Sequence, residues 1–395
     1  MKEGWEYKKL GEIATEMYRG SGIKRDQVTK EGTPCVRYGE IYTTYNISFD
    51  TCASHTKIEN VTSPKYFEYG DLLFAITGES VEDIGKTIAY LGDEKCLCGG
   101  DIICMKHHQN PKYLAYALST PDAIRQKGIG KTKLKVVHTN APALKAISIP
   151  LAPLSEQQSI VDYLDAAFAK IDAMKANAEK ALNEAKALFQ ASLKEMLEPK
   201  EGWEEKKLGD VGTFIRGGNF SKKDFVEDGY PCIHYGQIHT KFGVATFEHL
   251  SCVPETMVKK ERCASKGDLV IAITSEDDEG SCKCTAWMAD YDAYVGGHTA
   301  IFKHNLNPIY VSYYFKAARF QKDKLDYTHG FKVVEISPKD IAKIPICYPS
   351  AEEQQSIVDT LDSLKSKVDR LQANYEKISQ ECDALKQAIL RQVFE

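Results

Sequence analysis

The sequence predicts an α+β fold with two similar globular domains in a pseudo-two-fold arrangement, separated by a long antiparallel coiled coil of two helices. Three observations support this prediction: an internal repeat, two long heptad patterns, and short apolar strands divided by turn residues. The chain has 395 residues, of which 43% are hydrophobic and 27% charged, as is usual for a folded globular protein. This length allows two domains that each bury a core of their own.

The repeat has an offset of about 197 residues and covers nearly the whole chain. Three segments of the first half, Gly4–Gly11, Pro34–Ile41 and Gly70–Thr77, return in the second half as Gly202–Gly209, Pro231–Ile238 and Gly267–Thr274. The segment Glu156–Asp162 recurs unchanged as Glu353–Asp359. Because this period is far longer than that of a solenoid repeat, each half is expected to form a domain with its own connector.

The globular parts are expected at residues 1–153 and 199–349, and both read as mixed α and β structure. Leu72–Thr77 and Leu269–Thr274 are apolar runs preceded by Gly-Asp, which indicates buried strands. Tyr113–Leu118 and Tyr310–Phe315 each follow an Asn-Pro pair, and proline in the first turn is typical of a helix start.

The connectors, residues 154–198 and 350–395, are predicted to be helices of about 40 residues, or ~60 Å at 1.5 Å per residue. In the second helix, apolar residues recur at alternating spacings of three and four over about four heptads, after a capping box formed by Ser350 and Glu353. The first helix begins near Ser155 and has a similar but alanine-rich seam when the offset is applied. The principal seam residues are Leu164, Ile171, Met174 and Leu188 in the first helix, and Leu361, Leu364, Val368, Leu371, Tyr375, Ile378, Leu385 and Ile389 in the second.

Small residues facing large ones allow two helices to approach closely, so the two seams favour one intramolecular antiparallel pair. The alternative is that each helix packs only on the core of its own domain. Two capped helices of about 40 residues are too long to be covered in that way by domains of about 150 residues.

The net charge of −5 lies mainly in the two helices, which leaves the globular parts close to neutral. Basic residues gather within them at Arg125, Lys127, Lys131, Lys133 and Lys135, and again at Lys316, Arg319, Lys322, Lys324 and Lys332. A local patch is sufficient for phosphate contacts despite a negative total charge. Either cluster alone is equally well explained as solvated surface lysines, but its recurrence in both halves favours a binding role.

Several motifs resemble enzyme signatures without completing them. Gly128–Thr132 resembles the end of a phosphate-binding loop, but Arg125 stands where its first glycine is required. Asn110-Pro111-Lys112-Tyr113 lacks the second proline of the adenine-holding element of amino-methyltransferases, and a helix cap explains it better. The twelve cysteines have no zinc-ligand spacing and are expected to be reduced thiols. We therefore expect no metal, no cofactor and no catalysis in this chain.

Aromatic, basic and amide residues alternate with glycines in segments expected to be loops, a combination that suits contacts with phosphates and base edges. Core aromatics and turn glycines would explain each segment alone about as well. The DNA-binding residues predicted on this basis, together with the basic clusters, are Arg19, Lys24, Arg25, Arg37, Tyr38, Lys131, Lys133, Lys135, Arg216, Asn219, Lys222, Lys223, His234, Tyr235, Gln237 and Lys332. The two halves share a framework but differ at these positions, as expected for modules that read different sequences.

The whole chain resembles the specificity subunits of type I restriction-modification systems. The resemblance rests on Trp5–Gly11 and Trp203–Gly209, on Ile149–Gln157 running into the first long helix, and on the looser second copy from Ile344 to Gln354. It implies a non-catalytic DNA-binding subunit with two target-recognition domains, which reads a bipartite, asymmetric target in double-stranded DNA while the coiled coil sets the gap.

The same resemblance implies partners that carry out the chemistry. Two methyltransferase subunits would bring S-adenosylmethionine and methylate adenine, and ATP-dependent restriction or translocase subunits are an optional further partner. No apolar run is long enough for a membrane span, and the absence of a secretion signal suggests the cytoplasm. Two other hypotheses remain: a coiled-coil interaction scaffold without base-specific readout of DNA, and, with less support, a solitary methyltransferase.

Overall fold

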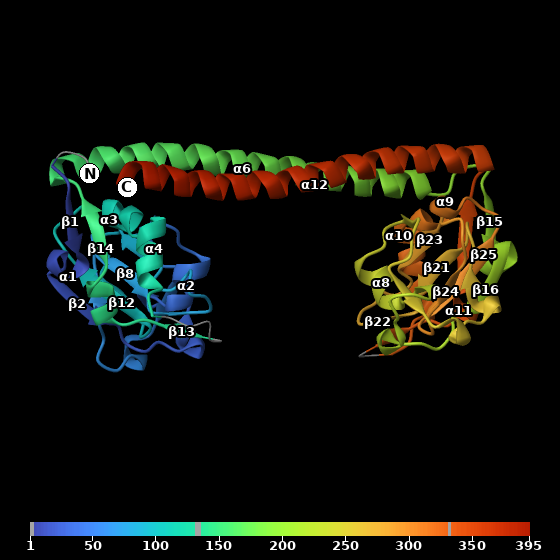
Figure 1. The fold of residues 1–395 in the computed structure, drawn as a ribbon, viewed down its shortest axis with the longest axis horizontal. Coiled ribbons are helices and arrows are strands. Elements are labelled where there is room, and N and C mark those ends of the chain that lie inside the picture. The colour runs from blue at the N-terminus through green and yellow to red at the C-terminus, as the bar shows by residue number, and fades with distance from the viewer. Residues whose placement is uncertain (1–3, 131–135, 331–332) are drawn as a thin grey trace. The chain divides into compact units, whose positions relative to one another are not determined.

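The computed structural model describes residues 4–130, 136–330 and 333–395, and these divide into two compact units (Figure 1). Unit 1 contains the chain up to Ala178 together with Tyr375–Glu395, and unit 2 contains Glu179–Asn374. Two helices of 44 residues each, α6 (Leu154–Leu197) and α12 (Ala351–Phe394), contribute residues to both units. Each unit therefore combines one globular domain with parts of both long helices.

The described residues of the domain of unit 1 form two mixed five-stranded sheets, two short ladders and five short α-helices. The first sheet has the order β2 (Glu16–Arg19), β12 (Ile102–Lys106), β8 (Leu72–Ala75), β10 (Thr87–Tyr90), β5 (Ser48–Phe49), and the second β3 (Val28–Thr29), β6 (Ser54–Thr56), β4 (Thr33–Val36), β11 (Cys96–Cys98), β7 (Tyr66–Phe67). The ladders join β1 (Glu6–Lys9) to β14 (Ser148–Leu151) and β13 (Val137–His138) to β9 (Thr77–Gly78). The helices are α1 (Leu10–Ile13), α2 (Tyr38–Thr43), α3 (Pro111–Ala117), α4 (Pro121–Lys127) and α5 (Ala141–Lys145).

Unit 2 repeats this organisation with one strand fewer among the described residues of its second sheet. The sheets have the orders β16 (Gly212–Arg216), β25 (Thr299–His304), β21 (Leu269–Ala272), β23 (Cys284–Trp287), β18 (Ala245–Thr246), and β19 (Ser251–Val253), β17 (Tyr230–Ile233), β24 (Ala293–Val295), β20 (Cys263–Ala264). The ladders join β15 (Glu204–Lys207) to β27 (Pro345–Tyr348) and β22 (Thr274–Ser275) to β26 (Val334–Glu335). The helices are α7 (Leu208–Val211), α8 (Tyr235–Thr240), α9 (Pro308–Tyr314), α10 (Ala318–Asp323) and α11 (Pro338–Ile341).

Strand β8 explains why its sequence is apolar without alternation. Successive side chains of a strand point to opposite faces of the sheet, and both faces are covered here. Leu72 and Phe74 join the core that lies beneath the long helices, whereas Leu73 and Ala75 join a second core shared with β4 and β11. The predicted strand and the predicted helix starts after Asn-Pro are confirmed, because Asn110 caps α3 by accepting from the Tyr113 amide.

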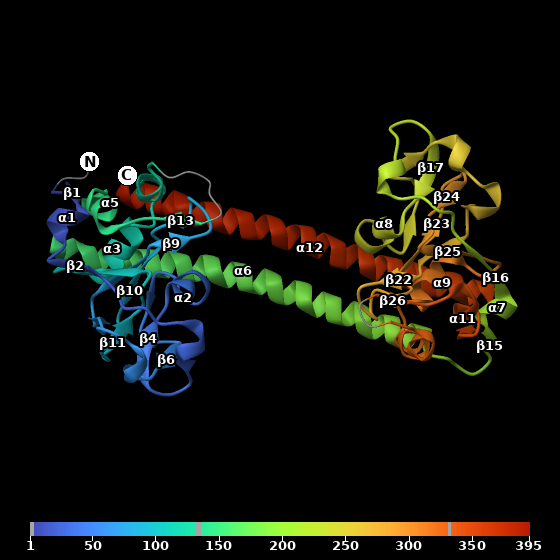
Figure 2. The same cartoon turned by 90° about the horizontal axis from the view of Figure 1, so that it is seen from below.

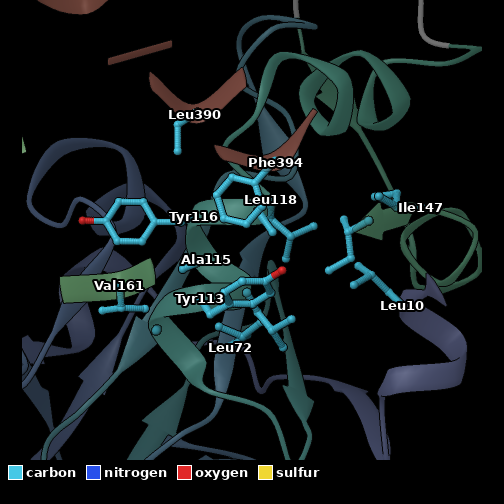
Figure 3. Packing of buried hydrophobic residues seen from close by; sticks show 14 of the residues in the cluster. Leu10, Leu72, Tyr113, Ala115, Tyr116, Leu118, Ile147, Val161, Leu390 and Phe394 are labelled. Carbon is cyan, nitrogen blue, oxygen red and sulfur yellow. The ribbon is translucent and has the colours of Figure 1, made fainter. Parts of the chain in front are cut away.

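The core of unit 1 is completed by residues from both long helices, as Figure 3 shows around Tyr113 of α3. Val161 comes from the first turns of α6, whereas Leu390 and Phe394 come from the last turns of α12. The Phe394 ring packs edge-on against Tyr113 at a centroid distance of 5.3 Å and against Trp5 at 6.2 Å. The two ends of the described chain thus meet in one apolar cluster.

Within each unit, α6 and α12 lie side by side (Figure 2) and pair through polar bridges as well as apolar residues. In unit 1, Lys386 pairs with Asp172 and Lys175 with Asp383, which fixes the antiparallel direction. In unit 2, the Lys186 ammonium donates to the Gln372 side chain at 2.9 Å. The predicted antiparallel pair of long helices is confirmed.

Three of the predicted seam residues are wrong. Met174 and Leu188 are 58% exposed and Leu385 is 46% exposed, whereas Leu182 and Phe189 are buried. Applying the repeat offset places Ala181 and Leu188 of α6 in the seam, but the buried residues are their neighbours Leu182 and Phe189. Since a helix turns about 100° per residue, this one-position error moves a side chain from the seam to the outside. In α12 the heptad pattern likewise places Leu385 in the seam, whereas Cys382 and Leu390 are the buried residues there. The other predicted seam residues, listed by position, are buried or half-buried: Leu164, Ile171, Leu361, Leu364, Val368, Leu371, Tyr375, Ile378 and Ile389.

Candidate nucleic-acid interface

The turn before α2 in unit 1 places a basic and an aromatic side chain at the rim of a hollow. Arg37 is the N-cap residue of this helix, and its backbone N–H donates to the Glu40 carboxylate at 2.9 Å. Ser54 of β6 donates a second hydrogen bond to Glu40, so this buried carboxylate fixes the turn from two sides. Tyr38 follows on the first turn of α2 with its side chain exposed.

This hollow has a volume of about 660 Å³ and brings together residues from three separate segments. Its lining includes Gly22, Lys24, Arg25, Arg37, Tyr38, Gly39, Glu40, Thr43, Gly100 and Asp101. Four predicted residues therefore lie around one cavity, although up to 14 positions separate them in the sequence. Three of the four are cationic, and the lining also contains the Glu40 and Asp101 carboxylates.

Arg37 has one buried donor without a partner among the described residues. This donor is Nε, whereas Nη2 of the same guanidinium contacts Glu40 at 3.2 Å. Nearby, two hydrogen bonds fix the Arg19 guanidinium. Its Nε donates to the Gly100 carbonyl at 2.5 Å and its Nη2 donates to Asp101 at 2.7 Å. Arg19 is nevertheless mostly exposed and remains accessible to a polyanion.

The matching turn in unit 2 has the same frame with different side chains. The His234 N–H donates to the Gln237 side-chain oxygen at 2.9 Å, and the Gln237 amide donates to Ser251 at 2.9 Å. Gln237, a predicted DNA-binding residue, thus uses both of its polar atoms to hold the turn, as Glu40 does in unit 1. A side chain at the third helical position is directed back to the N-cap, which is the geometry of a capping box.

His234 takes the place of Arg37, and its side chain is buried, with 7% of its surface exposed. Burial lowers the pKa of this imidazole, with smaller contributions from the charges of Lys222 and His298. The ring Nδ1 accepts from the Gly236 N–H at 3.1 Å, which leaves the proton of the neutral ring on Nε2. The ring also lies against Tyr235 at a centroid distance of 4.5 Å, and Tyr235 contacts the ring of His298.

The remaining predicted residues of unit 2 lie on the surface. Asn219, Lys222 and Lys223 are exposed, the two lysines at the start of a single 3₁₀ turn. Arg216 pairs with Glu335 at 3.2 Å and donates to the Gly297 carbonyl, as Arg19 does to Gly100. Lys131, Lys133, Lys135 and Lys332 were also predicted to bind DNA, and they lie outside the described residues.

Two members of the predicted basic clusters cannot contact a ligand. Lys127 is only 5% exposed, and its ammonium donates to Thr87 Oγ1 at 3.1 Å and to the Leu118 carbonyl at 2.8 Å. Burial lowers the pKa of Lys127 to about 7. Lys324, at the matching position, is buried in the same way and donates to the Ser281 carbonyl. The recurrence of these lysines therefore reflects a shared structural contact.

Some glycines of the predicted loops are needed for close packing of the backbone, and others leave space for a ligand at the hollow. A Cβ on Gly20 would lie 2.2 Å from the Gly99 carbonyl oxygen, and one on Gly217 would lie 1.9 Å from that of Gly296. Gly22 and Gly39 instead face open space at the hollow. Asp101 lines the hollow and the ring of His298 contacts Tyr235, and in the sequence both residues follow a repeated Gly-Gly pair.

The described residues contain no group of three or more His, Cys, Asp or Glu side chains able to hold a metal ion. Within the same ranges, no helix combines the length and apolarity needed to cross a membrane.

The repeated fold presents two matching turns, before α2 and before α8, and comparison with known families gives the class of the protein. A family model described as "Type I restriction modification DNA specificity domain" matches residues 2–184 and again residues 200–380. The chain belongs to this family.

Individual relatives and solved structures agree with this assignment. The specificity subunit of the StySPI type I restriction enzyme from Salmonella potsdam is 27% identical over 196 residues, 48% of this chain and 42% of the relative. The chain thus matches less than half of that protein. The putative MjaX specificity subunit from Methanocaldococcus jannaschii is 25% identical over 95% of this chain and 90% of its own length.

Two solved structures share the fold over the whole chain. One comes from a study of complex assembly and conformational transition of the type I restriction-modification system, with a TM-score of 0.77 at 20% identity and 98% of that chain covered. The other is the HsdS subunit from Thermoanaerobacter tengcongensis, with a TM-score of 0.60 at 17% identity and 97% of that chain covered.

Proposed function

We propose that this chain is the sequence-specific DNA-binding subunit of a type I restriction-modification complex. Each domain reads one half of a bipartite, asymmetric target in double-stranded DNA, and partner subunits methylate adenine within it. The observation that carries this proposal is the pair of matching turns before α2 and α8. Their main-chain frames are the same, whereas the side chains that they present, Arg37 and His234, differ in charge and shape.

The division of labour follows from the chemistry of the surface residues. Lys24, Arg25, Lys222 and Lys223 supply exposed positive charge for phosphates, which orients a domain on the duplex without reading its sequence. Arg37 and Tyr38 in unit 1, and Tyr235 in unit 2, supply donors and ring faces for base edges, and the buried His234 ring lies against Tyr235. Half-sites read from one face of the duplex would lie roughly 10 base pairs apart.

The chemical steps are assigned to partners. Two methyltransferase subunits would bind S-adenosylmethionine, and restriction or translocase subunits, where present, would use ATP. This chain supplies the recognition and holds no cofactor of its own. We place the complex in the cytoplasm, where its DNA substrate is found.

The proposal is tested by mapping methylated adenines in a host that expresses this chain with its methyltransferase subunits. We expect one two-part motif that disappears when the gene for this chain is deleted. In parallel, the purified complex should shift a duplex that carries the motif. Methylation that persists without the chain, or a complex that binds no DNA, would support the scaffold hypothesis instead.

The phosphate contacts predict a change in salt dependence. Replacing Lys24 and Arg25 together with alanine removes two cations from the hollow of unit 1. The slope of log affinity against log salt should become shallower by about 2, since each phosphate contact contributes roughly 0.9. The affinity of the complex for its motif is measured at salt concentrations from roughly 50 to 300 mM. Lys180→Ala, an exposed lysine of α6, is the control, and a slope unchanged from wild type in the double variant would contradict the assignment.

A further inference from the structure

Each domain is joined to the first turns of its long helix by a polar joint that uses the most strictly repeated residues of the chain. In unit 1 the joint consists of Asn110, Gln157 and Gln158, and in unit 2 of Asn307, Gln354 and Gln355. We refer to these sets as joint 1 and joint 2. The three residues of each joint belong to the Asn-Pro helix starts and to the recurring Glu-Gln-Gln-Ser-Ile-Val-Asp segment, for which DNA recognition alone gives no role.

Joint 1 is centred on Gln157, whose side chain is completely buried. Its oxygen accepts from the Asn110 backbone N–H at 2.9 Å, and its amide donates to the Ala152 carbonyl at 2.9 Å. The same amide contacts the Gln109 side chain at 2.8 Å. One side chain of α6 therefore bonds the entry to α3 and the strand end that precedes α6.

A second link in joint 1 runs across the surface. The Asn110 amide donates to the Gln158 oxygen at 2.7 Å, while Asn110 Oδ1 caps α3 by accepting from the Tyr113 N–H. Slightly further along, the Tyr116 hydroxyl donates to Asp165 of α6 at 2.7 Å. The first turns of α6 are thus fixed to one face of α3.

Joint 2 reproduces these distances almost unchanged. Gln354 accepts from the Asn307 N–H at 2.9 Å and donates to the Pro349 carbonyl at 2.9 Å. Asn307 donates to Gln355 at 2.8 Å, and the Tyr313 hydroxyl donates to Asp362 at 2.7 Å. The two joints are therefore alike in residue type and geometry, whereas the readers before α2 and α8 differ between the halves.

We propose that joints 1 and 2 are positioning sites that hold each recognition domain in one orientation on its long helix and thereby fix the gap between the two half-sites. This inference rests on the proposed function. Buried amides are suited to this task because their hydrogen bonds are directional, whereas the surrounding apolar contacts of α6 permit small rotations. An incorrect orientation would leave a buried donor or acceptor unpaired, which is costly.

The test opens joint 1 while keeping the cap of α3. In the opened variant, Asn110→Asp with Gln158→Glu, the aspartate still caps α3, and the glutamate loses the hydrogen bond that Gln158 donates to Asp162 at 2.8 Å, so thermal stability is measured alongside. Across the joint, however, two carboxylates now face each other in place of the amide hydrogen bond. The reclosed variant, Asn110→Asp with Gln158→Lys, keeps the same cap and closes the joint again with an ion pair.

The complexes are compared on duplex libraries that carry both half-sites at gaps one or two base pairs shorter and longer than the native gap. We expect the opened variant to raise methylation at gaps one base pair off by roughly tenfold relative to the native gap, which corresponds to about 1.4 kcal/mol. The half-site sequences should not change. The reclosed variant should restore the strict gap.

Three outcomes are distinguishable. A strict gap in the opened variant, at wild-type thermal stability, would overturn the inference, as would a change in the half-site bases. If the opened variant of joint 1 is destabilised, the same pair of substitutions is made in joint 2, at Asn307 and Gln355. A relaxed gap there at wild-type thermal stability, or a strict gap restored in the reclosed variant, shows loss of positioning and not loss of fold. A wild-type complex that methylates no bipartite target would instead refute the proposed function.

Discussion

Transferring the reader pair of unit 2 into unit 1 should change the sequence of one half-site and leave the other intact. The exchange is Arg37→His together with Glu40→Gln. An arginine that contacts guanine presents two donors, whereas the neutral histidine that replaces it presents one, and a good bidentate contact is worth ~1–3 kcal/mol of base discrimination. Preference at one base pair should therefore fall by roughly 5- to 150-fold. The methylated motif is measured by sequencing modified adenines.

Both substitutions are needed because the side chains of each pair are matched in charge. Glu40 is buried and lies beside the Arg37 guanidinium, so Arg37→His alone leaves a carboxylate without its partner. Gln237 shows that a neutral amide fills the same place beside a neutral imidazole. Glu31→Gln, at an exposed residue of the same domain, is the control. An unaltered motif from an active double variant would show that the turn before α2 does not read bases.

The largest effect on stability is expected at the end of α12. Phe394→Ala removes a buried ring from the core of unit 1, and such truncations typically cost ~3–5 kcal/mol. At ~2–4 °C for each kcal/mol, the melting temperature of unit 1 should fall by roughly 6–20 °C. Calorimetry of the purified chain measures this shift.

Two substitutions on the same chain calibrate the result. Phe394→Leu introduces the residue that α6 carries at the matching position, Leu197, and should cost much less. Leu385→Ala, on the exposed side of α12, should have little effect. An equal loss of stability in Leu385→Ala and Phe394→Ala would contradict the packing shown in Figure 3.

The repeat and the periodicity of the helices were sufficient to predict the architecture. Heptad patterns over 44 residues and Asn-Pro caps are local signals, because the hydrogen bonds of a helix and of its cap join residues close in sequence. The phase of the α6 seam was not predictable from the offset, because Leu182 and Phe189 are buried where the offset points to their neighbours Ala181 and Leu188. Two adjacent residues of a helix can each be assigned to the seam, and the packing against the partner helix determines which of them is buried.

For the candidate site, the sequence indicated which types of residue gather there, but not the contact that each side chain makes. Arg37, Lys24 and Arg25 meet at one hollow, as the loop composition suggested. The roles of Gln237 and Lys127 depended on what surrounds them: a capping box for Gln237 and a buried carbonyl for Lys127. A sequence shows that a side chain is charged or polar, but only the fold shows whether its hydrogen bonds are already made inside the protein.

Phe394 also has a consequence for synthesis. The first domain emerges from the ribosome long before the residue that closes its core, and at roughly 5–20 residues per second the delay is on the order of 10–40 s. During that interval Trp5 and Tyr113 lack the ring that packs edge-on against both of them in the finished protein. A chain that stops early, through a nonsense codon or a broken message, would never acquire that ring, and its first domain would keep an incomplete core.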